Sequence, residues 1–123
     1  MTGVLYSWRL LVHVRNESRG TVLGGAVTVA DSSPTRNVGL LKHTSLNAGE
    51  GLWIVPCQSV HTFFMKFAID LVYLDKRRRV RKVRHTVPPW RISACIWAHS
   101  VLELPAGIAA ATGTEIGDQL TIE

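Results

Sequence analysis

The sequence predicts a mainly β fold: an antiparallel β-sandwich or barrel with one or two short helices, in a single domain over residues 1–123. Short runs rich in branched and aromatic residues recur along the chain, separated by clusters of Gly, Pro, Asn, Asp and Ser. The sequence lacks the alternation of strands with long helices that would indicate a parallel sheet. We therefore expect helix to make up less than about a quarter of the chain.

Eight strands and two helical segments follow from this punctuation. The expected strands are residues 9–15, 21–30, 52–55, 60–65, 69–74, 80–87, 100–104 and 119–122. The expected helical segments are residues 35–43 and 105–112, and residues 90–98 are expected to be irregular.

Glycine and proline justify several of these boundaries. The pair Gly24-Gly25 indicates a bulge or a break in the second strand. Pro34 is expected in the first turn of a helix, where its missing N–H has no consequence. Pro56 ends the third strand because proline cannot donate to a ladder, and Pro88 ends the return arm of a hairpin with its tip at residues 76–79.

Composition excludes several classes of protein. Apolar residues make up 46% and charged residues 19% of the chain, as in an ordinary soluble domain. No apolar run approaches the roughly 20 residues that span a bilayer, and the N-terminal stretch lacks the basic start and cleavage site of an export signal. We therefore expect a cytoplasmic protein with no membrane partner, and a monomer.

The cysteines predict neither a disulfide framework nor a zinc site. Cys57 and Cys95 are too few for the first, and no short-spaced pair of Cys or His supports the second. We expect two reduced thiols that lie close together in space, and no metal or other cofactor.

The positive charge is concentrated in one segment. Net charge is +5, and seven of the 14 basic residues fall within residues 76–84, namely Lys76, Arg77, Arg78, Arg79, Arg81, Lys82 and Arg84. On a hairpin these cations could bind the phosphates of nucleic acid or another acidic surface, with Trp90 and Trp97 stacking on bases. The simpler interpretation is that a hairpin tip must be polar and that basic side chains on an edge strand prevent aggregation.

Three polar residues of catalytic type lie within two apolar runs: His61, Lys66 and Asp70. Buried polar groups must be paired or face water, so we expect these three to form a polar pocket at one pole of the fold. There they could bind a small polar or anionic ligand, or His61 could act as a base oriented by Asp70. The simpler interpretation is a Lys66–Asp70 ion pair that closes a hairpin, with His61 bonded to backbone.

Glu103 is the unexpected residue in the apolar run of residues 101–107. The simplest interpretation is a carboxylate that faces solvent, although it could also favour the start of a following helix. Arg36 is its candidate partner, or an anion ligand in its own right. No nucleophile elbow, phosphate-binding loop or zinc-protease motif is present, so a hydrolase with His61 as base is only a further alternative.

Four segments carry a family resemblance: GLL at residues 39–41, GEGLWIVPCQSVHTFFM at 49–65, IDLVYLD at 69–75 and VLELPAG at 101–107. In order and spacing they resemble the bacterial and archaeal family called domain of unknown function 192. The resemblance implies a mainly β fold, and it favours a site at His61, Lys66, Asp70 and Glu103 because the family motif shares these positions. The chain departs from the family pattern at Phe64, where a small residue is frequent, and in its more basic residues 76–84.

These observations predict a binding domain for a small polar or anionic ligand, or for a partner, at the pole marked by His61, Lys66, Asp70, Glu103 and Arg36. A nucleic-acid or acidic-surface binding module through residues 76–84 is the alternative.

Overall fold

The computed structural model describes residues 10–31 and 44–123. Within them the strands are β1 (Leu11–Asn16), β2 (Thr21–Ala30), β3 (Glu50–Ile54), β4 (Ser59–His61), β5 (Ile69–Leu74), β6 (Val80–Val87), β7 (Ile92–Ala94), β8 (Ser100–Pro105) and β9 (Leu120–Ile122). The helix is α3 (Ile108–Ala111). The predicted mainly β fold is confirmed. The helix expected at residues 35–43, with Arg36, lies outside the described residues.

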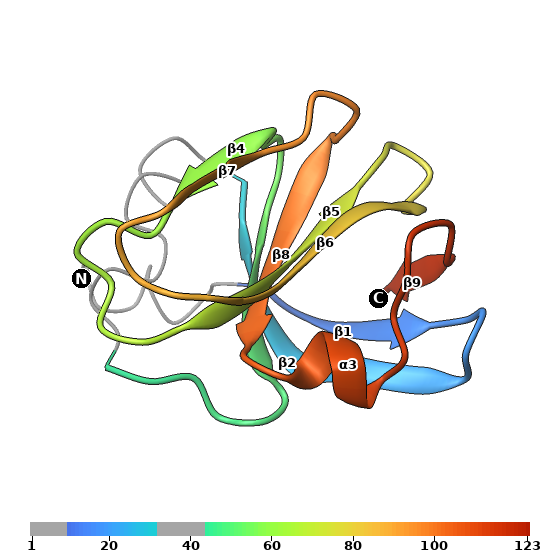
Figure 1. The fold of residues 1–123 in the computed structure, drawn as a ribbon. Coiled ribbons are helices and arrows are strands. Elements are labelled where there is room, and N and C mark those ends of the chain that lie inside the picture. The colour runs from blue at the N-terminus through green and yellow to red at the C-terminus, as the bar shows by residue number, and fades with distance from the viewer. Residues whose placement is uncertain (1–9, 32–43) are drawn as a thin grey trace, which may run out of the picture.

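The strands form one large curled sheet and one small sheet (Figure 1). The large sheet has seven strands in the order β6-β5-β8-β3-β2-β1-β9, and β4 pairs with β7 in the second sheet. Every pair is antiparallel except β2 with β3, which run in parallel. The bulge predicted at Gly24-Gly25 is present as a shift of register between β1 and β2.

The large sheet has an apolar core on each of its faces. The first core is built from Val12, Val14, Leu23, Val27, Val72, Leu74, Val80, Leu102, Leu104, Ala109, Leu120 and Ile122. The second core is built from Ala30, Leu52, Ile54, Met65, Ile69, Leu71, Tyr73, Val87, Cys95, Ala98 and Val101. Alternate residues of β5 and β8 enter the two cores, as the period of two in a strand requires. Both faces of these central strands are therefore buried.

The β4–β7 sheet covers the second core and is fastened to it by polar contacts. The hydroxyl of Tyr73 donates to Oγ of Ser93 over 2.9 Å, and burial raises the pKa of Tyr73 to about 12. The ammonium group of Lys82, on β6, donates to the carbonyl of Ala94 over 2.7 Å. The N–H of Cys95 donates to the carbonyl of Gln58, the residue after Cys57, so the two cysteines lie on adjacent segments as predicted.

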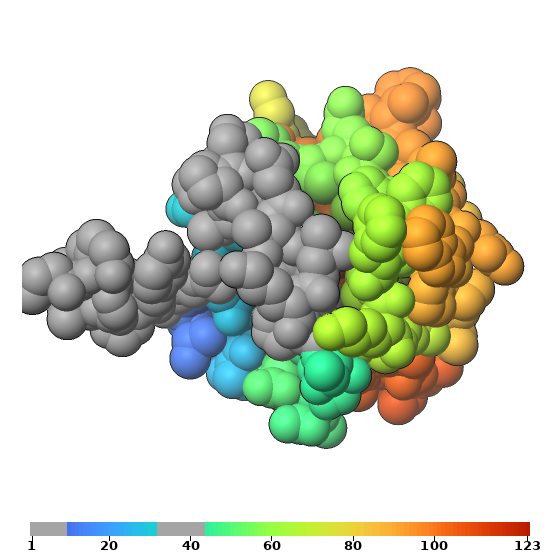
Figure 2. All heavy atoms as spheres, turned by 90° about the vertical axis from the view of Figure 1, so that its left-hand side faces the viewer, coloured from blue at the N-terminus to red at the C-terminus, as the bar shows by residue number. Residues whose placement is uncertain are grey.

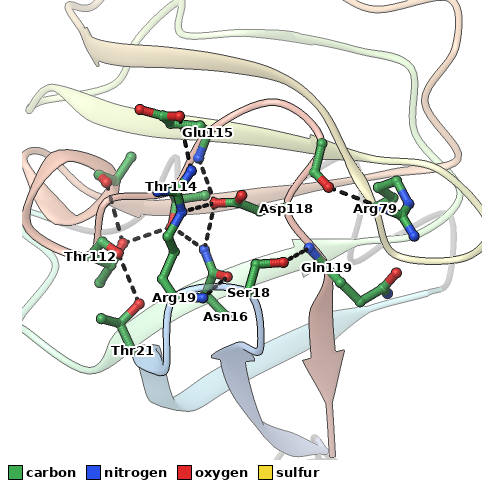
Figure 3. A network of polar contacts seen from close by, with 12 residues as sticks. Asn16, Ser18, Arg19, Thr21, Arg79, Thr112, Thr114, Glu115, Asp118 and Gln119 are labelled. Carbon is green, nitrogen blue, oxygen red and sulfur yellow. Dashed lines mark hydrogen bonds and ion pairs between the residues drawn. The ribbon is translucent and has the colours of Figure 1, made fainter.

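A buried polar network joins the β1–β2 turn to the segment that follows α3 (Figure 3). The amide of Asn16 donates to Oγ1 of Thr114 and to Oδ2 of Asp118, and Nε of Arg19 donates to the same carboxylate oxygen. Burial alone would raise the pKa of Asp118, but the hydrogen bonds from Arg19 and Asn16 outweigh it and hold that pKa below its usual value. The polar groups of the network find their hydrogen-bond partners within it, so its role is to hold these two chain segments together.

Two predicted segments differ from the structure. The strand expected at residues 60–65 ends at His61, because the chain turns at Phe64, whose φ of 66° is incompatible with a strand. The segment expected to be irregular, residues 90–98, contains β7, which pairs with β4. Within the described residues no helix is long and apolar enough to cross a membrane.

Candidate functional site

Asp70 lies at the start of β5 and is completely buried. Its Oδ1 accepts the N–H of Thr86 over 2.8 Å, and its Oδ2 accepts the N–H groups of Gly107 over 3.1 Å and Ala109 over 2.9 Å. The first bond satisfies a bulge in β6, where two residues oppose Asp70, and the others cap the start of α3. The carboxylate is therefore a structural anchor between three chain segments.

The structure does not bring His61, Lys66 and Asp70 together. Asp70 shares its face of β5 with Val72 and Leu74 and so belongs to the side of the first core, whereas His61 lies on the sheet that covers the second core. His61 and Lys66 are exposed. Among residues 10–31 and 44–123 no ion pair joins Lys66 to Asp70. The hairpin that was expected to pair these two is absent because the chain turns before Lys66.

Glu103 is buried, in contrast to the solvent-facing carboxylate expected from its sequence. Its side chain stands between Leu52 of β3 and Leu71 of β5 on the second-core side of β8, and the residue is only 3% exposed. Burial raises the pKa of Glu103 to about 7. Within the described ranges its carboxyl group has no hydrogen bond or ion pair, and Arg36 lies outside them.

Thr62 ties two loops together directly after β4. Its hydroxyl donates to the carbonyl of Pro88 over 2.7 Å and accepts the N–H of Arg91 over 2.9 Å. Its own N–H donates to the carbonyl of Arg91, and its carbonyl accepts the N–H groups of Met65 and Trp90. Thr62 itself is buried. These bonds hold the turn at residues 62–68 against the turn that leads into β7.

Four aromatic side chains project from these two turns, and we call them the aromatic platform: His61, Phe63, Phe64 and Trp90. The ring of Phe63 lies 5.0 Å from that of His61 and is stacked 5.6 Å from that of Trp90, while Phe64 meets Trp90 edge-on at 4.8 Å. Figure 2 shows the yellow-green atoms that follow β4 lying against the orange atoms of the β7 segment on one outer face.

The platform is exposed, although its rings are largely apolar and two of its residues have strained backbone conformations. Phe64 is 68% exposed and Trp90 is 57% exposed. Both have left-handed backbone conformations, with φ of 66° and 67°. A left-handed conformation costs a bulky residue about 1–2 kcal/mol. The fold therefore holds two large rings in solvent at a cost in stability.

The surroundings of the platform are uniformly basic in sequence. Residues 51–69 and 76–102, which include β4, β6 and β7 together with parts of β3 and β8, contain nine of the 14 Lys and Arg residues and no Asp or Glu. Arg91 follows Trp90 and is exposed, as is Lys66. At the tip of the basic hairpin, Oδ1 of Asp75 accepts the N–H groups of Arg77 and Arg79. The face can therefore attract anions.

The tip of the basic hairpin is exposed as predicted at Lys76, Arg77 and Arg79, but Arg78 turns inward. Its guanidinium lies 5.2 Å from the ring centre of Trp53 and donates to the carbonyl of Ile122 over 3.0 Å. Beside the tip, two adjoining shallow hollows of about 320 and 420 Å³ share Gln58, Ala98 and His99. Trp97, Lys76, Arg77 and Asp75 line the larger one.

Comparison with known proteins places the chain in a family. The model of the DUF192 family, described as "Uncharacterized ACR", matches residues 13–122. The chain belongs to this family. It is 34% identical over 111 residues to a UPF0127 protein of Pyrococcus horikoshii, covering 85% of this chain and 94% of that protein. It is 32% identical over 114 residues to a UPF0127 protein of Thermococcus sibiricus, covering 88% of this chain and 73% of that protein.

The DUF192 fold also has a crystallographic counterpart. A protein of unknown function from Novosphingobium aromaticivorans superposes with a TM-score of 0.78 at 23% identity, covering 92% of this chain and 84% of that chain. At this identity the likeness concerns the fold alone. Among residues 10–31 and 44–123 of the DUF192 chain, no group of three His, Cys, Asp or Glu side chains could hold a metal ion.

Sequence reasoning selected His61 and Lys66, and it named Trp90 as a candidate for base stacking beside the basic hairpin. It did not foresee that Phe63, Phe64 and Trp90 lie together. Thr62 gave no signal, because a lone threonine in an apolar run is ordinary in a strand. Two signals were available. Phe64 departs from the family pattern, and Trp90 follows two prolines, which separate it from any regular strand.

Proposed function

We propose that this DUF192 protein is a binding domain whose ligand surface is the aromatic platform, and that its ligand is an anion that carries a planar or apolar group. His61 and Lys66 keep the role expected of them, as residues of the ligand surface. Asp70 does not share that role, because its carboxylate is committed to backbone N–H groups of Thr86, Gly107 and Ala109.

One observation carries the proposal: Phe64 and Trp90 are strained, exposed and in edge contact with each other. Neither burial nor regular secondary structure explains why two large rings are held in this way. Backbone strain of this kind concentrates at functional sites, where it preorganises side chains for a ligand. The hydrogen bonds of Thr62 supply the rigidity that such preorganisation needs.

The sign of the charge indicates an anion. The exposed cations that adjoin the platform in sequence, Lys66 and Arg91, favour negative ligands. The hydrolase alternative is weaker, because the carboxylate expected to orient His61 is engaged elsewhere.

Titration with 1-anilinonaphthalene-8-sulfonate, an anionic aromatic dye, tests the proposal. We expect saturable binding by the folded protein, with emission enhanced on the platform. The Trp90→Ala and Phe64→Ala variants should each weaken binding. Leu11→Ala removes an exposed apolar side chain from β1 and is the matched control, since Leu11 is 58% exposed. Equal binding by all four proteins would contradict the proposal, as would no binding by the wild type.

A further inference from the structure

We infer that the anion is a single-stranded polynucleotide, whose bases stack on Trp90 and Trp97 while its phosphates follow the basic residues beside β6 and β7. The inference rests on the proposed function and names the class of ligand for the same face.

Aromatic side chains are exposed at both ends of the segment that contains β7. Trp90 belongs to the platform at one end, and Trp97, which is 67% exposed, lines the hollow of about 420 Å³ at the other. They are seven positions apart in the sequence, a span of at most about 25 Å. Between them the side chains of Ile92 and Ile96 are also exposed. An extended polymer can contact both ends at once.

Cations accompany the aromatic rings at both ends. The guanidinium of Arg81 lies 6.0 Å from the ring centre of Trp97, and Lys76 and Arg77 line the hollow beside that ring. Arg91 directly follows Trp90, and its side chain is exposed. A ligand that contacts both ends therefore meets a planar apolar surface next to a positive charge twice. A polynucleotide repeats a planar base and a phosphate in the same way.

The fixed geometry of the rings favours unpaired bases over other anionic partners. Phe63, Phe64 and Trp90 are held in fixed mutual geometry by the hydrogen bonds of Thr62, which suits stacking on a flat ring. Insertion into an anionic bilayer requires exposed apolar side chains and cations but no fixed ring geometry. An acidic peptide supplies the charge without a regular series of planar groups. Base faces are free to stack on protein rings only where the strand is unpaired.

Fluorescence anisotropy with a fluorescein-labelled oligothymidylate tests the inference, using about 15 nucleotides so that one full site is covered. We expect binding at low salt, with an affinity that falls as salt rises by about 0.7 in the log–log slope for each phosphate contact. Trp90→Ala and Trp97→Ala should each weaken binding by roughly 5- to 150-fold, the effect of losing one stacked base. An oligouridylate of the same length should bind through the same residues.

Arg81→Gln and Arg15→Gln form a matched pair for the charge. The two side chains are 42% and 44% exposed, and each has one acidic neighbour, Asp75 at 3.6 Å and Glu17 at 3.3 Å. Both substitutions lower the net charge equally, but Arg15 lies on β1, away from this face. Arg81→Gln should weaken binding and reduce the salt slope by about 0.7, whereas Arg15→Gln should leave the slope unchanged.

The outcomes separate this inference from the proposed function. If the sulfonate dye binds the platform but neither oligonucleotide binds at low salt, the inference is wrong and the proposed function stands. Cosedimentation with phosphatidylserine vesicles in the absence of oligonucleotide binding would likewise overturn it in favour of a membrane surface. If Arg81→Gln and Arg15→Gln lost the same affinity for the oligonucleotide, binding would depend on net charge alone, and the inference would again be wrong. Circular dichroism melting of each variant verifies that it is folded when it is tested.

Discussion

The carboxylate of Asp70 holds Thr86 in a left-handed backbone conformation: the N–H of Thr86 donates to Oδ1 over 2.8 Å, and its φ is 49°. A β-branched residue adopts such a φ only where its surroundings enforce it. The other carboxylate oxygen caps α3 through Gly107 and Ala109. One buried side chain thus stabilises the bulge that ends β6 and the start of the helix.

Asp70→Asn should therefore destabilise the protein by about 2–4 kcal/mol, because a neutral amide weakens the charge-assisted bonds and presents its NH₂ group to a backbone N–H. Urea denaturation measures the loss. Asp75→Asn is the control, since Asp75 also accepts two backbone N–H groups but is only half-buried. Asp75→Asn should lose less unfolding free energy than Asp70→Asn. Dye binding should be unchanged in both variants when they are folded, and a binding defect in folded Asp70→Asn would return Asp70 to the ligand site.

Glu103 should make stability fall as the pH rises. Burial raises its pKa from 4.5 to about 7, so the folded state favours the protonated carboxyl. Its contribution to stability is fully present below pH 4.5 and is lost as the pH rises through about 7. This difference in pKa corresponds to about 3 kcal/mol.

Glu103→Gln, which mimics the protonated form, should match the wild type near about pH 4 and exceed its stability near about pH 8. Urea denaturation across this range gives the difference in unfolding free energy between the two proteins. Glu115→Gln is the control, because the side chain of Glu115 is 70% exposed. A difference between Glu103→Gln and the wild type that does not vary with pH would contradict the prediction, because it would mean that Glu103 has the same pKa in the folded and unfolded states.

Local patterns predicted most of the fold. The hairpin of β5 and β6 follows from two runs of strand-forming residues on either side of the basic tip, and both strands have the predicted bounds. Strand pairings between segments far apart in the sequence cannot be predicted from local residue patterns. The parallel contact of β2 with β3 depends on the path of residues between them, and β7 is a strand only because β4 lies beside it.

The candidate site was predictable only in part. The polar residues were correctly recognised as unusual, but the partners of a buried carboxylate cannot be inferred from its neighbours in sequence. Asp70 finds its donors 16, 37 and 39 residues away. The strand expected at residues 60–65 also ends early, since the left-handed turn at Phe64 breaks its alternation.

Phe64→Gly should be more stable than Phe64→Ala by about 1 kcal/mol, because glycine adopts a φ of 66° without strain and alanine does not. Both variants lack the ring, so the comparison isolates the backbone. Both should lose affinity for the dye. Chemical denaturation gives the stabilities, and an alanine variant as stable as the glycine variant would mean that Phe64 is not strained.

Thr62→Val should loosen the platform while preserving the shape of the side chain. The substitution removes the hydroxyl that donates to Pro88 and accepts from Arg91, and it leaves a partly buried carbonyl and a partly buried N–H without this partner. We expect a loss of about 1–3 kcal/mol in unfolding free energy. Thr62→Ser keeps the hydroxyl and removes one methyl group, so it should lose only about 1 kcal/mol.

The two variants should also differ in binding. If the hydroxyl of Thr62 holds the turn of Phe64 against the turn of Trp90, its removal frees the rings to move. Binding must then order the rings, and this lowers the affinity. Dye affinity, measured well below the melting temperature of each variant, should therefore fall in Thr62→Val and be largely retained in Thr62→Ser. Wild-type affinity in folded Thr62→Val would mean that the platform is held by ring contacts alone, without the hydroxyl of Thr62.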